Sequence, residues 1–207
     1  MQQLTNSQRE DDWFEARLGL ATSSKFNDIM AKGRNGAELA MRKNYRAQLV
    51  SERLTGEKAE NRTNAAMDWG TEFEDTARLR YELKTGNEVV ESGFYKHDKL
   101  DAGASPDGFI GEDGLVEIKC PNSATHIETL RRKTVPKQYF WQVQGQMWVT
   151  GRQWCDFVSF DPRLPENAQL FITRVERDDE SIKELEAEVT TFLREVAGEV
   201  KFVESYE

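Results

Sequence analysis

The sequence predicts an α/β domain in which a mixed β-sheet is flanked by helices. Apolar residues recur at helical spacing in several long segments, and shorter segments between them alternate apolar and polar residues as strands do. No repeat, linker or low-complexity tract interrupts the 207 residues. We therefore expect one domain spanning residues 1–207, large enough to bury a hydrophobic core.

The helices are predicted from their end signals and their apolar spacing. The first follows Ser7 and Glu10, which form a capping-box pattern, and it stops at Gly19. A second helix is expected to start after Thr22 or Ser23, and the polar residues 57–64 are expected to form a loop. The other predicted helices cover residues 37–54, 68–84, 138–150 and a C-terminal segment within 178–207.

Strands are predicted between these helices, where apolar and β-branched residues form short runs. The predicted strands cover residues 89–96, a hairpin within 105–120, and the two late segments 154–160 and 170–175. Helices before, between and after these strands are typical of a mixed sheet.

The charge is unevenly distributed along the chain. The formal net charge is −9, which is unfavourable for a protein that handles nucleic acid, but residues 178–207 carry ten acidic and three basic side chains and leave −2 for the rest. The acidic residues are expected to be the solvated face of one amphipathic helix. Its apolar face is predicted to contain Ile182, Leu185, Val189, Phe192, Leu193 and Val196. Two basic clusters can contact phosphates or be ordinary surface charge; they comprise Arg42, Lys43, Arg46 and Arg53, and Arg131, Arg132, Lys133 and Lys137.

Several protein classes are excluded by composition. No stretch approaches the roughly 20 apolar residues of a membrane span, and the N-terminus lacks a signal-peptide pattern, so a soluble cytoplasmic protein without a membrane partner is expected. Cys120 and Cys155 are too few for a disulfide scaffold or a thiolate zinc site, and Cys120 is expected to point into the core. With only His97 and His126, chemistry based on histidine is not expected.

A short β-hairpin carries the most informative residues. It runs from Ser105-Pro106-Asp107-Gly108 through a tight turn at residues 111–114 to the alternating segment 115–120. Glu117 and Lys119 fall on one face of that second strand, which is expected to be polar, and the opposite face is expected to be buried. Pro106 and Gly108 place Asp107 where a strand begins or bends.

The length of the turn decides whether Asp107 can meet Glu117. With a three-residue loop, residues 111–113, Asp107 lies directly opposite Glu117 with the two Cβ atoms about 4.5–5.5 Å apart. A four-residue loop would place Asp107 opposite Ile118, unless a bulge restored the meeting. We favour the three-residue loop.

Two carboxylates on one face of a hairpin suit a hard divalent cation. Mg²⁺ keeps several waters and takes one or two protein carboxylates plus phosphate oxygens, and Mn²⁺ is expected to substitute for it. The hairpin therefore predicts a metal-dependent phosphodiester hydrolase with Asp107, Glu117 and Lys119 at its centre. The alternative is a solvated acidic hairpin in which Glu117 and Lys119 form the exposed face of an edge strand.

Four separated motifs extend this prediction over most of the chain. They are Trp13-Phe14-Glu15-Ala16-Arg17-Leu18-Gly19 with Thr22-Ser23-Ser24, Trp69-Gly70-Thr71-Glu72-Phe73-Glu74, Ser105-Pro106-Asp107-Gly108 with Glu117-Ile118-Lys119-Cys120-Pro121, and Gln142-Val143-Gln144 with Met147-Trp148-Val149-Thr150. Asp161-Pro162-Arg163 is a fifth, weaker match. Together, in this order, they resemble the lambda exonuclease family of viral recombination alkaline exonucleases. That family belongs to the restriction-endonuclease-like PD-(D/E)XK superfamily, so the resemblance implies a restriction-endonuclease-like mixed β-sheet core flanked by helices.

The resemblance implies a metal site around the hairpin. Asp107, Glu117 and the backbone carbonyl of Ile118 would ligate magnesium, and Lys119 would act on the attacking water as a base or as a cationic stabiliser. Glu74 would support a second metal position.

Two of the residues that the resemblance places at the catalytic centre have simpler alternatives. Glu74 lies four residues before Arg78 and can form an exposed ion pair with it, and Glu72 is an adjacent competitor for its role. Gln142 belongs to a polar face of its helix, with Tyr139 and Gln146, and either touches the catalytic water or faces solvent.

The resemblance also implies a site for the DNA end. Arg17, Ser24 and Ser105 match the positions that bind the terminal 5′-phosphate, which suits a forked guanidinium and two hydroxyls. Met67 matches an apolar wedge that splits the last base pairs. From the residues alone, Arg17 would be a surface charge, Ser24 a capping residue and Met67 a loop methionine.

The function implied by the resemblance is a magnesium-dependent exonuclease that degrades the 5′-ended strand of linear double-stranded DNA in the 5′ to 3′ direction. It would release mononucleotides and leave 3′ single strands for recombination in a bacterial host cell, which suggests a phage or prophage origin. The family implies a ring-shaped homotrimer and a single-strand annealing protein as partner. The alternatives are a structure-specific or restriction-type DNA endonuclease and a non-catalytic DNA-binding relative.

Overall fold

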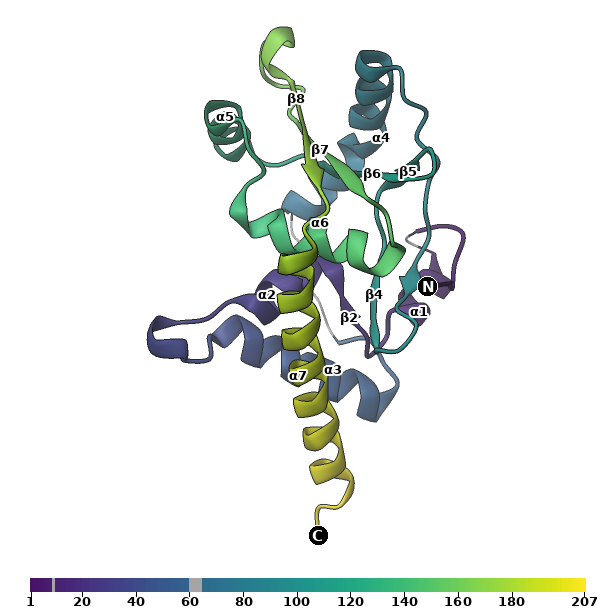
Figure 1. Cartoon of the computed structure of the whole chain (residues 1–207), viewed down its shortest axis with the longest axis vertical. Coiled ribbons are helices and arrows are strands. Elements are labelled where there is room, and N and C mark those ends of the chain that lie inside the picture. The colour runs from purple at the N-terminus through teal and green to yellow at the C-terminus, as the bar shows by residue number, and fades with distance from the viewer. Residues whose placement is uncertain (9, 60–64) are drawn as a thin grey trace.

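The computed structural model describes residues 1–8, 10–59 and 65–207, and for residues 65–68 it describes only the backbone. Figure 1 shows the arrangement of the elements. Up to residue 104 they are β1 (Gln2–Gln3), α1 (Asp11–Ala16), β2 (Ala21–Thr22), η1 (Ser23–Lys25), α2 (Phe26–Met30), η2 (Arg34–Gly36), α3 (Ala40–Thr55), α4 (Ala65–Thr85), β3 (Tyr95–Lys96) and β4 (Ala102–Ala104). The later elements are β5 (Gly108–Ile110), β6 (Gly114–Lys119), α5 (Ser123–Arg132), α6 (Lys137–Thr150), β7 (Trp154–Phe160), η3 (Glu166–Ala168), β8 (Leu170–Glu176) and α7 (Asp179–Glu204).

The described strands form two mixed sheets. The first has the order β1-β3-β4-β2, with β2 parallel to β4, and the second has the order β5-β6-β7-β8, with β6 parallel to β7. The predicted mixed α/β fold is therefore confirmed, although the strands are divided between two sheets. The division falls between β4 and β5, where Pro106 has no N–H to continue a ladder.

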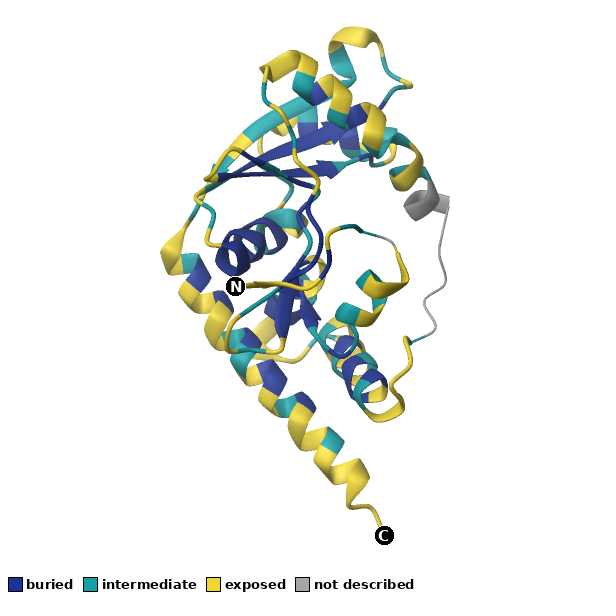
Figure 2. Cartoon of the chain, turned by 90° about the vertical axis from the view of Figure 1, so that its right-hand side faces the viewer, coloured by how far each residue is buried: buried dark blue, intermediate teal, exposed yellow. Residues whose placement is uncertain are grey.

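Helix α6 lies between the two sheets and is buried over most of its length. Every residue from Gln142 to Thr150 is buried, and Figure 2 shows this helix as a dark-blue segment in the middle of the molecule. On one side Met147 packs in a cluster with Leu115 of β6, and on the other Trp148 packs in a cluster with Ala102 of β4. The polar side chains of α6 from Gln142 onward are therefore removed from water.

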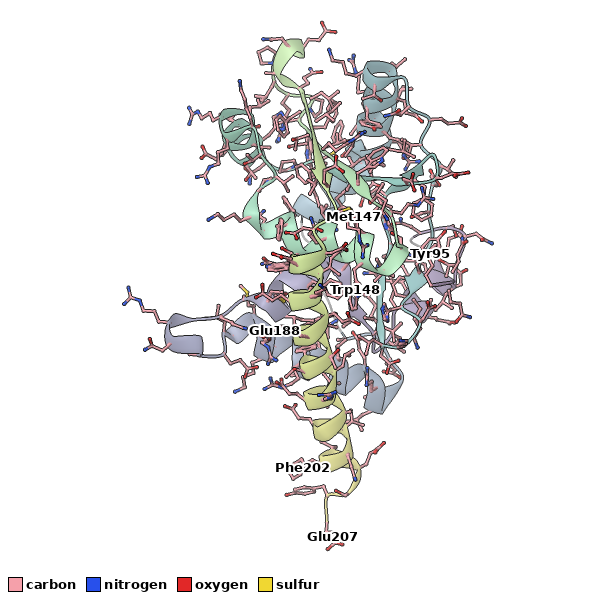
Figure 3. The ribbon with its side chains drawn as sticks, viewed as in Figure 1. Tyr95, Met147, Trp148, Glu188, Phe202 and Glu207 are labelled. Atoms are coloured by element: carbon pink, nitrogen blue, oxygen red, sulfur yellow. The ribbon has the colours of Figure 1, made fainter. Side chains whose placement is uncertain are left out.

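Helix α7 confirms the predicted C-terminal helix and its apolar face, since all six predicted residues are buried. It packs against α3, where Arg42 and Arg46 form ion pairs with Glu195, and Arg46 also with Glu199. These two arginines are thus occupied by helix packing and do not form a phosphate-binding cluster. The end of α7 extends past the body of the protein, as the labelled Phe202 and Glu207 show (Figure 3). In the described part of the chain, no helix is long and apolar enough to cross a membrane.

Two predictions of local structure were wrong, and one helix was missed. Helix α1 starts at Asp11 rather than at residue 8, because Ser7 Oγ donates to the Glu10 carboxylate (2.7 Å) instead of capping the helix. The expected strand 89–96 is reduced to β3, with a single bridge between Val90 and Phe109 before it. Helix α5 was not predicted, although Asn122 caps it by accepting a hydrogen bond from Thr125 N–H. The expected loop 57–64 falls partly outside the described residues.

Candidate active site

The hairpin has the three-residue turn. Ile110 pairs with Gly114 and Gly108 pairs with Val116, so the residue before β5, Asp107, lies opposite Glu117. Gly111 in the turn has φ +53°, a conformation that glycine adopts without strain. The favoured register is confirmed, and it brings the two carboxylates to one face.

Strand β6 is an interior strand, and the polar face expected on it is not exposed. Strand β5 flanks it on one side and β7 on the other, and the Glu117 side chain is 1% exposed. The face that carries Glu117 also carries Leu115, which packs with Val143 and Met147 of α6. The alternative of a solvated edge strand is therefore wrong, because α6 covers this face.

Three donors hold the buried carboxylate of Glu117. Gln142 Nε2 donates to Oε1 (2.5 Å) and Gln146 Nε2 donates to Oε2 (2.5 Å), one helical turn apart on α6. Lys119 Nζ also lies 2.5 Å from Oε1. This arrangement orients the buried carboxylate, because charge-assisted hydrogen bonds replace the lost water. Gln142 therefore faces Glu117 and not solvent.

A negative charge on Asp107 is unfavourable in its surroundings. Its Oδ2 accepts a hydrogen bond from Ile118 N–H (2.6 Å), which fixes the side chain against β6. Burial, together with repulsion from Glu117 and Glu74, raises the pKa of Asp107 well above its usual value. For Lys119, burial alone lowers the pKa, but Glu117 and Asp107 outweigh it and raise the pKa above the usual range. The site therefore concentrates negative charge around one ammonium group.

A cleft of about 740 Å³ opens beside this cluster. Its lining includes Lys119, Ile118 and Glu74, whereas Glu72 is exposed and outside the lining. Glu74 also lies 4.0 Å from Arg78 Nη2, so it takes part in the simple helix pair as well. Geometry thus favours Glu74 over Glu72 as the residue that faces the site.

The donor set fits a hard divalent cation. Among the described residues, no group of three or more acidic, histidine or cysteine side chains is positioned to hold a metal ion. A cation at this hairpin would therefore use Asp107, Glu117, the Ile118 carbonyl and non-protein oxygens, which is the mode that Mg²⁺ prefers. A cation would also relieve the repulsion that raises the pKa of Asp107.

Arg17 and Ser105 meet next to the hairpin. Arg17 Nη1 donates to Ser105 Oγ (3.4 Å), Trp13 Nε1 donates to the same oxygen (2.8 Å), and the Arg17 guanidinium lies 3.9 Å from the centre of the Trp13 ring. Burial lowers the pKa of Arg17 to about 10, although Tyr45 and Glu52 act in the opposite direction. A half-buried cation that faces an aromatic ring and, among the described residues, makes one long hydrogen bond suits an anionic ligand.

Ser24 lies near this pair by the sheet register. Strand β2 runs parallel to β4, with Thr22 paired to Gly103, so Ser24 and Ser105 both follow the carboxyl ends of adjacent strands. Ser24 is exposed, and its Oγ lies 3.4 Å from Thr22 Oγ1. The structure therefore brings the three expected phosphate-binding residues to one edge of the first sheet. The side chain of Met67, the expected wedge, lies outside the described residues.

Three positioning residues were not predicted from the sequence. The carbonyl oxygen of Pro106, directly before Asp107, accepts hydrogen bonds from Gln8 Nε2 (2.7 Å) and Ser92 Oγ (2.5 Å). Gln146 is the third, and its other amide atom, Oε1, is buried with no hydrogen-bond partner among the described residues. The i, i+4 spacing of Gln142 and Gln146 was the available signal, but it did not reveal that both face Glu117.

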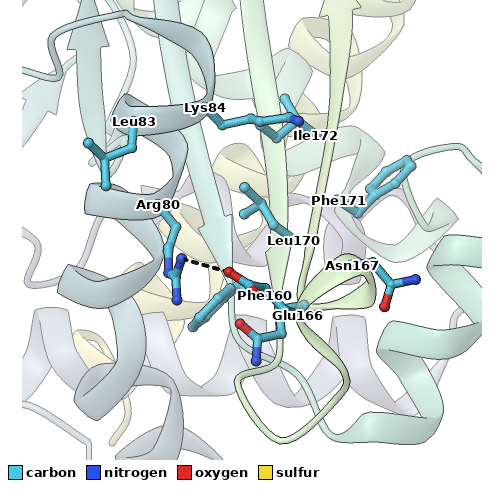
Figure 4. Close-up of a pocket in the computed structure, with 10 residues that line it drawn as sticks. Arg80, Leu83, Lys84, Phe160, Glu166, Asn167, Leu170, Phe171 and Ile172 are labelled. Atoms are coloured by element: carbon cyan, nitrogen blue, oxygen red, sulfur yellow. Dashed lines mark ion pairs between the residues drawn. The ribbon is translucent and has the colours of Figure 1, made fainter.

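A second cavity of about 590 Å³ lies elsewhere, between α4 and β8, and is lined in part by Arg80, Leu83, Phe160 and Ile172 (Figure 4). Arg80 and Glu166 form an ion pair of 3.9 Å at this cavity. None of the predicted site residues lines it, so it is separate from the Asp107, Glu117 and Lys119 cluster.

The fold and the Asp107, Glu117 and Lys119 cluster define a protein of the restriction-endonuclease-like PD-(D/E)XK class. More particularly, the chain belongs to the YqaJ-like viral recombinase domain family, whose model matches residues 12–153. The resemblance to lambda-type alkaline exonucleases is thereby confirmed. Among curated proteins, none matches the sequence significantly.

Solved structures agree with this family. The chain is 48% identical to an alkaline exonuclease, LHK-Exo, from Laribacter hongkongensis, with a TM-score of 0.87 over 94% of this chain and 96% of the relative. The structure of LHK-Exo in complex with dAMP gives 49% identity and a TM-score of 0.88 with the same coverage. A phage-related exonuclease from Haemophilus somnus shares the fold at 15% identity, with a TM-score of 0.72 over 91% of this chain and 96% of that one.

Proposed function

We propose that this protein is a magnesium-dependent exonuclease that degrades the 5′-ended strand of linear double-stranded DNA in the 5′ to 3′ direction. It releases mononucleotides and leaves 3′ single strands for recombination. The observation that carries the proposal is the convergence of Asp107, Glu117 and Lys119 at one hairpin beside an open cleft. The relative with 48% identity is an alkaline exonuclease, and its complex with dAMP supports a mononucleotide as the product.

Each residue has a role that its surroundings support. Asp107, Glu117 and the carbonyl of Ile118 hold the magnesium ion, and Glu74 supports a second metal position. When bound, the metal activates water and neutralises charge on the phosphate. Gln142 orients Glu117, and Lys119 acts on the attacking water from its place beside Glu117.

End recognition is the role proposed for the second group of residues. Arg17, Ser24 and Ser105 bind the terminal 5′-phosphate, because a half-buried guanidinium and two hydroxyls gather at one end of the first sheet. Trp13 holds both Arg17 and Ser105, which keeps the anion site preformed. Met67 is proposed as the wedge on the strength of the motif alone.

The remaining parts of the proposal concern assembly and setting. The chain is proposed to form a ring-shaped homotrimer around DNA, to work with a single-strand annealing protein, and to act in the bacterial cytoplasm as a phage or prophage product. The family description, a viral recombinase domain, supports the recombination setting.

One experiment tests polarity, end dependence and metal dependence together. Purified protein is incubated with linear duplexes labelled at the 5′ or the 3′ terminus and with a closed circle, in Mg²⁺, in Mn²⁺ and in a chelator. We expect label release as mononucleotide from the 5′-labelled duplex first, slower loss of the 3′ label, an intact circle and no reaction with chelator. Cutting of the circle would favour the endonuclease alternative.

Variants at the cluster provide the controls. Asp107→Asn and Lys119→Met should remove cutting and leave DNA binding measurable, because neither residue is assigned to the DNA end. If the Lys119→Met enzyme turns over as the wild type does, Lys119 has no part in the chemistry.

A further inference from the structure

The motif Asp161-Pro162-Arg163 has no role in the proposed function. In the structure Arg163 lines the same 740 Å³ cleft as Lys119 and Glu74. Lys119 and Arg163 are the basic side chains of that lining. Arg163 therefore adds a second positive charge to the wall of the active-site cleft.

The Arg163 side chain is held by Asp161, by the Trp69 ring and by a long hydrogen bond from Nη2 to the Pro121 carbonyl (3.4 Å). Its Nε donates to Asp161 Oδ1 (2.7 Å) and its Nη2 donates to Asp161 Oδ2 (3.0 Å), so the two groups form a forked pair. The guanidinium also lies 4.2 Å from the centre of the Trp69 ring, another residue of the cleft. Asp161 is 0% exposed and also accepts a hydrogen bond from Ser123 Oγ (2.6 Å), so its position is set by the core.

Part of this guanidinium remains available. The Arg163 side chain is 45% exposed, and its Nη1 has no hydrogen-bond partner within the described residues. A guanidinium whose orientation is already fixed loses little conformational entropy when it binds a phosphate oxygen. The exposed edge is therefore a preformed phosphate donor on the wall of the cleft.

We propose that Arg163 binds an internal backbone phosphate of the DNA strand that occupies the active-site cleft. The proposal rests on the proposed function, because it takes DNA as the substrate. Arg17, Ser24 and Ser105 are absent from the lining of the cleft, so Arg163 and Arg17 contact different phosphates. Arg17 serves the terminal phosphate, and Arg163 serves a phosphate beyond it.

The chain contains a matched control for this assignment. Arg174 makes the same forked pair with a buried aspartate, Asp156 (2.8 and 3.0 Å), lies 3.6 Å from the centre of the Trp154 ring, and is 46% exposed. Arg174 lines neither of the two cavities described above. If such a pair serves only packing, Arg163 and Arg174 should behave alike toward DNA.

The test measures equilibrium binding of a duplex to the full chain without divalent metal, over a range of salt concentrations. The wild type is compared with Arg163→Gln, Arg163→Lys and Arg174→Gln, on duplexes with 5′-phosphate and with 5′-hydroxyl ends. We expect Arg163→Gln to weaken binding roughly 10-fold at low salt and to reduce the slope of log K against log salt by about 0.9, the value of one phosphate contact. Arg163→Lys should keep the slope, and Arg174→Gln should match the wild type.

Comparison of the 5′-phosphate and 5′-hydroxyl duplexes distinguishes the role of Arg163 from that of Arg17. Loss of the Arg163 contact should affect both ends equally, because the phosphate involved is internal. An unchanged slope for Arg163→Gln, or an equal loss for Arg174→Gln, would overturn the proposal. If the wild type binds DNA but cuts no substrate in Mg²⁺, the proposed function fails while the comparison of slopes still decides the role of Arg163.

A measurement on the wild-type protein tests the proposal even if the variants do not fold. A dicarbonyl reagent that modifies arginine is applied with and without duplex, and modification is located by mass spectrometry. Because Arg163 and Arg174 are equally exposed, we expect DNA to protect Arg163 several-fold and to leave Arg174 reactive. Equal reactivity of Arg163 in both conditions would overturn the proposal.

Discussion

Arg17 is expected to decide which DNA ends the protein prefers. Its guanidinium is half-buried against Trp13 and, among the described residues, makes one long hydrogen bond to Ser105, so an incoming phosphate would supply further acceptor atoms. Arg17→Gln should lower kcat/KM on 5′-phosphate ends by roughly 10- to 100-fold, the range for hydrogen bonds to a charged group. On 5′-hydroxyl ends the rate should barely change. Steady-state rates on the two ends measure this, and an equal loss on both would remove Arg17 from the phosphate pocket.

Gln146 tests how Glu117 is held for metal binding. Its Nε2 donates to Glu117, while its Oε1 is buried without a hydrogen-bond partner in the described structure. Gln146→Leu therefore removes the hydrogen bond to Glu117 and also an unsatisfied buried acceptor that destabilises the fold. We expect Mn²⁺ affinity, measured by calorimetry without DNA, to fall about 10- to 100-fold, as for other residues that orient a metal ligand. The thermal midpoint should change little.

Gln144 provides the matched control on the same helix. It is also buried, but its Nε2 donates to the carbonyl of Glu176 and its Oε1 accepts from Asp178 N–H, away from Glu117. Gln144→Leu should therefore lower the thermal midpoint and leave Mn²⁺ affinity unchanged. If both variants lose metal affinity equally, the effect reflects general damage to α6 and not the orientation of Glu117.

At the scale of elements, two helical glycines show how tightly α6 is enclosed. A Cβ atom at Gly145 of α6 would lie 2.3 Å from Phe26 Cδ2, whereas a Cβ at Gly198 of α7 would meet nothing within 4 Å. Gly145→Ala should destabilise the protein by about 1–3 kcal/mol through overpacking. Gly198→Ala should stabilise it by about 0.5–1 kcal/mol through helix propensity. Urea unfolding of both variants measures this, and a neutral Gly145→Ala would show that α6 can shift away from α2.

The elements predictable from sequence are those whose signals lie within a few residues. Helix α7 was anticipated with all its buried positions, because one long apolar stripe faces one partner. The hairpin register followed from turn length alone, so Asp107 and Glu117 were placed together correctly. The short strands β1, β2 and β4 were missed, because two or three residues carry no period and pair only with distant segments.

The candidate site also combines features with local sequence signals, which were predictable, and contacts between distant segments, which were not. Asp107, Glu117 and Lys119 belong to one hairpin and could be grouped from spacing. The burial of Glu117 could not be predicted, because it depends on α6 covering β6, and the contacting residue of α6 lies 25 residues away in the sequence. Gln8 and Ser92 support Pro106 from far along the chain, so nothing local marks them.

At the scale of the whole molecule, the acidic charge is placed away from the site. Much of it lies on α7, where Glu195 and Glu199 are paired with arginines of α3 and the last turn extends past the body. The site itself is also rich in carboxylates, and there Glu117 and Glu74 repel a negative charge on Asp107. The stability of the metal-free protein should therefore depend on the protonation of its active site.

Asp107 allows this link between folding and protonation to be measured. Its pKa is raised in the folded state by burial, Glu117 and Glu74, so the folded protein binds this proton more tightly than the unfolded chain does. The metal-free wild type should then lose stability as the pH rises from the unfolded value of about 3.9 through the raised pKa. Asp107→Asn removes the charge and keeps an oxygen to accept from Ile118 N–H. Its thermal midpoint should match the wild type near about pH 4 and exceed it increasingly toward about pH 8.

Metal should reduce the difference in thermal midpoint between the wild type and Asp107→Asn, because a bound cation replaces the proton on Asp107. With Mg²⁺ at neutral pH, the wild-type midpoint should rise and that of Asp107→Asn should not. Asp161 has the opposite effect on the pH dependence of stability, because Arg163 and Ser123 stabilise its anion despite its burial and lower its pKa to about 2. Asp161 is present in both proteins, so its effect cancels in the difference between their thermal midpoints. A gap between wild type and variant that stays constant with pH would mean that Asp107 does not carry the unfavourable charge, and the metal would then have to be held mainly by other oxygens.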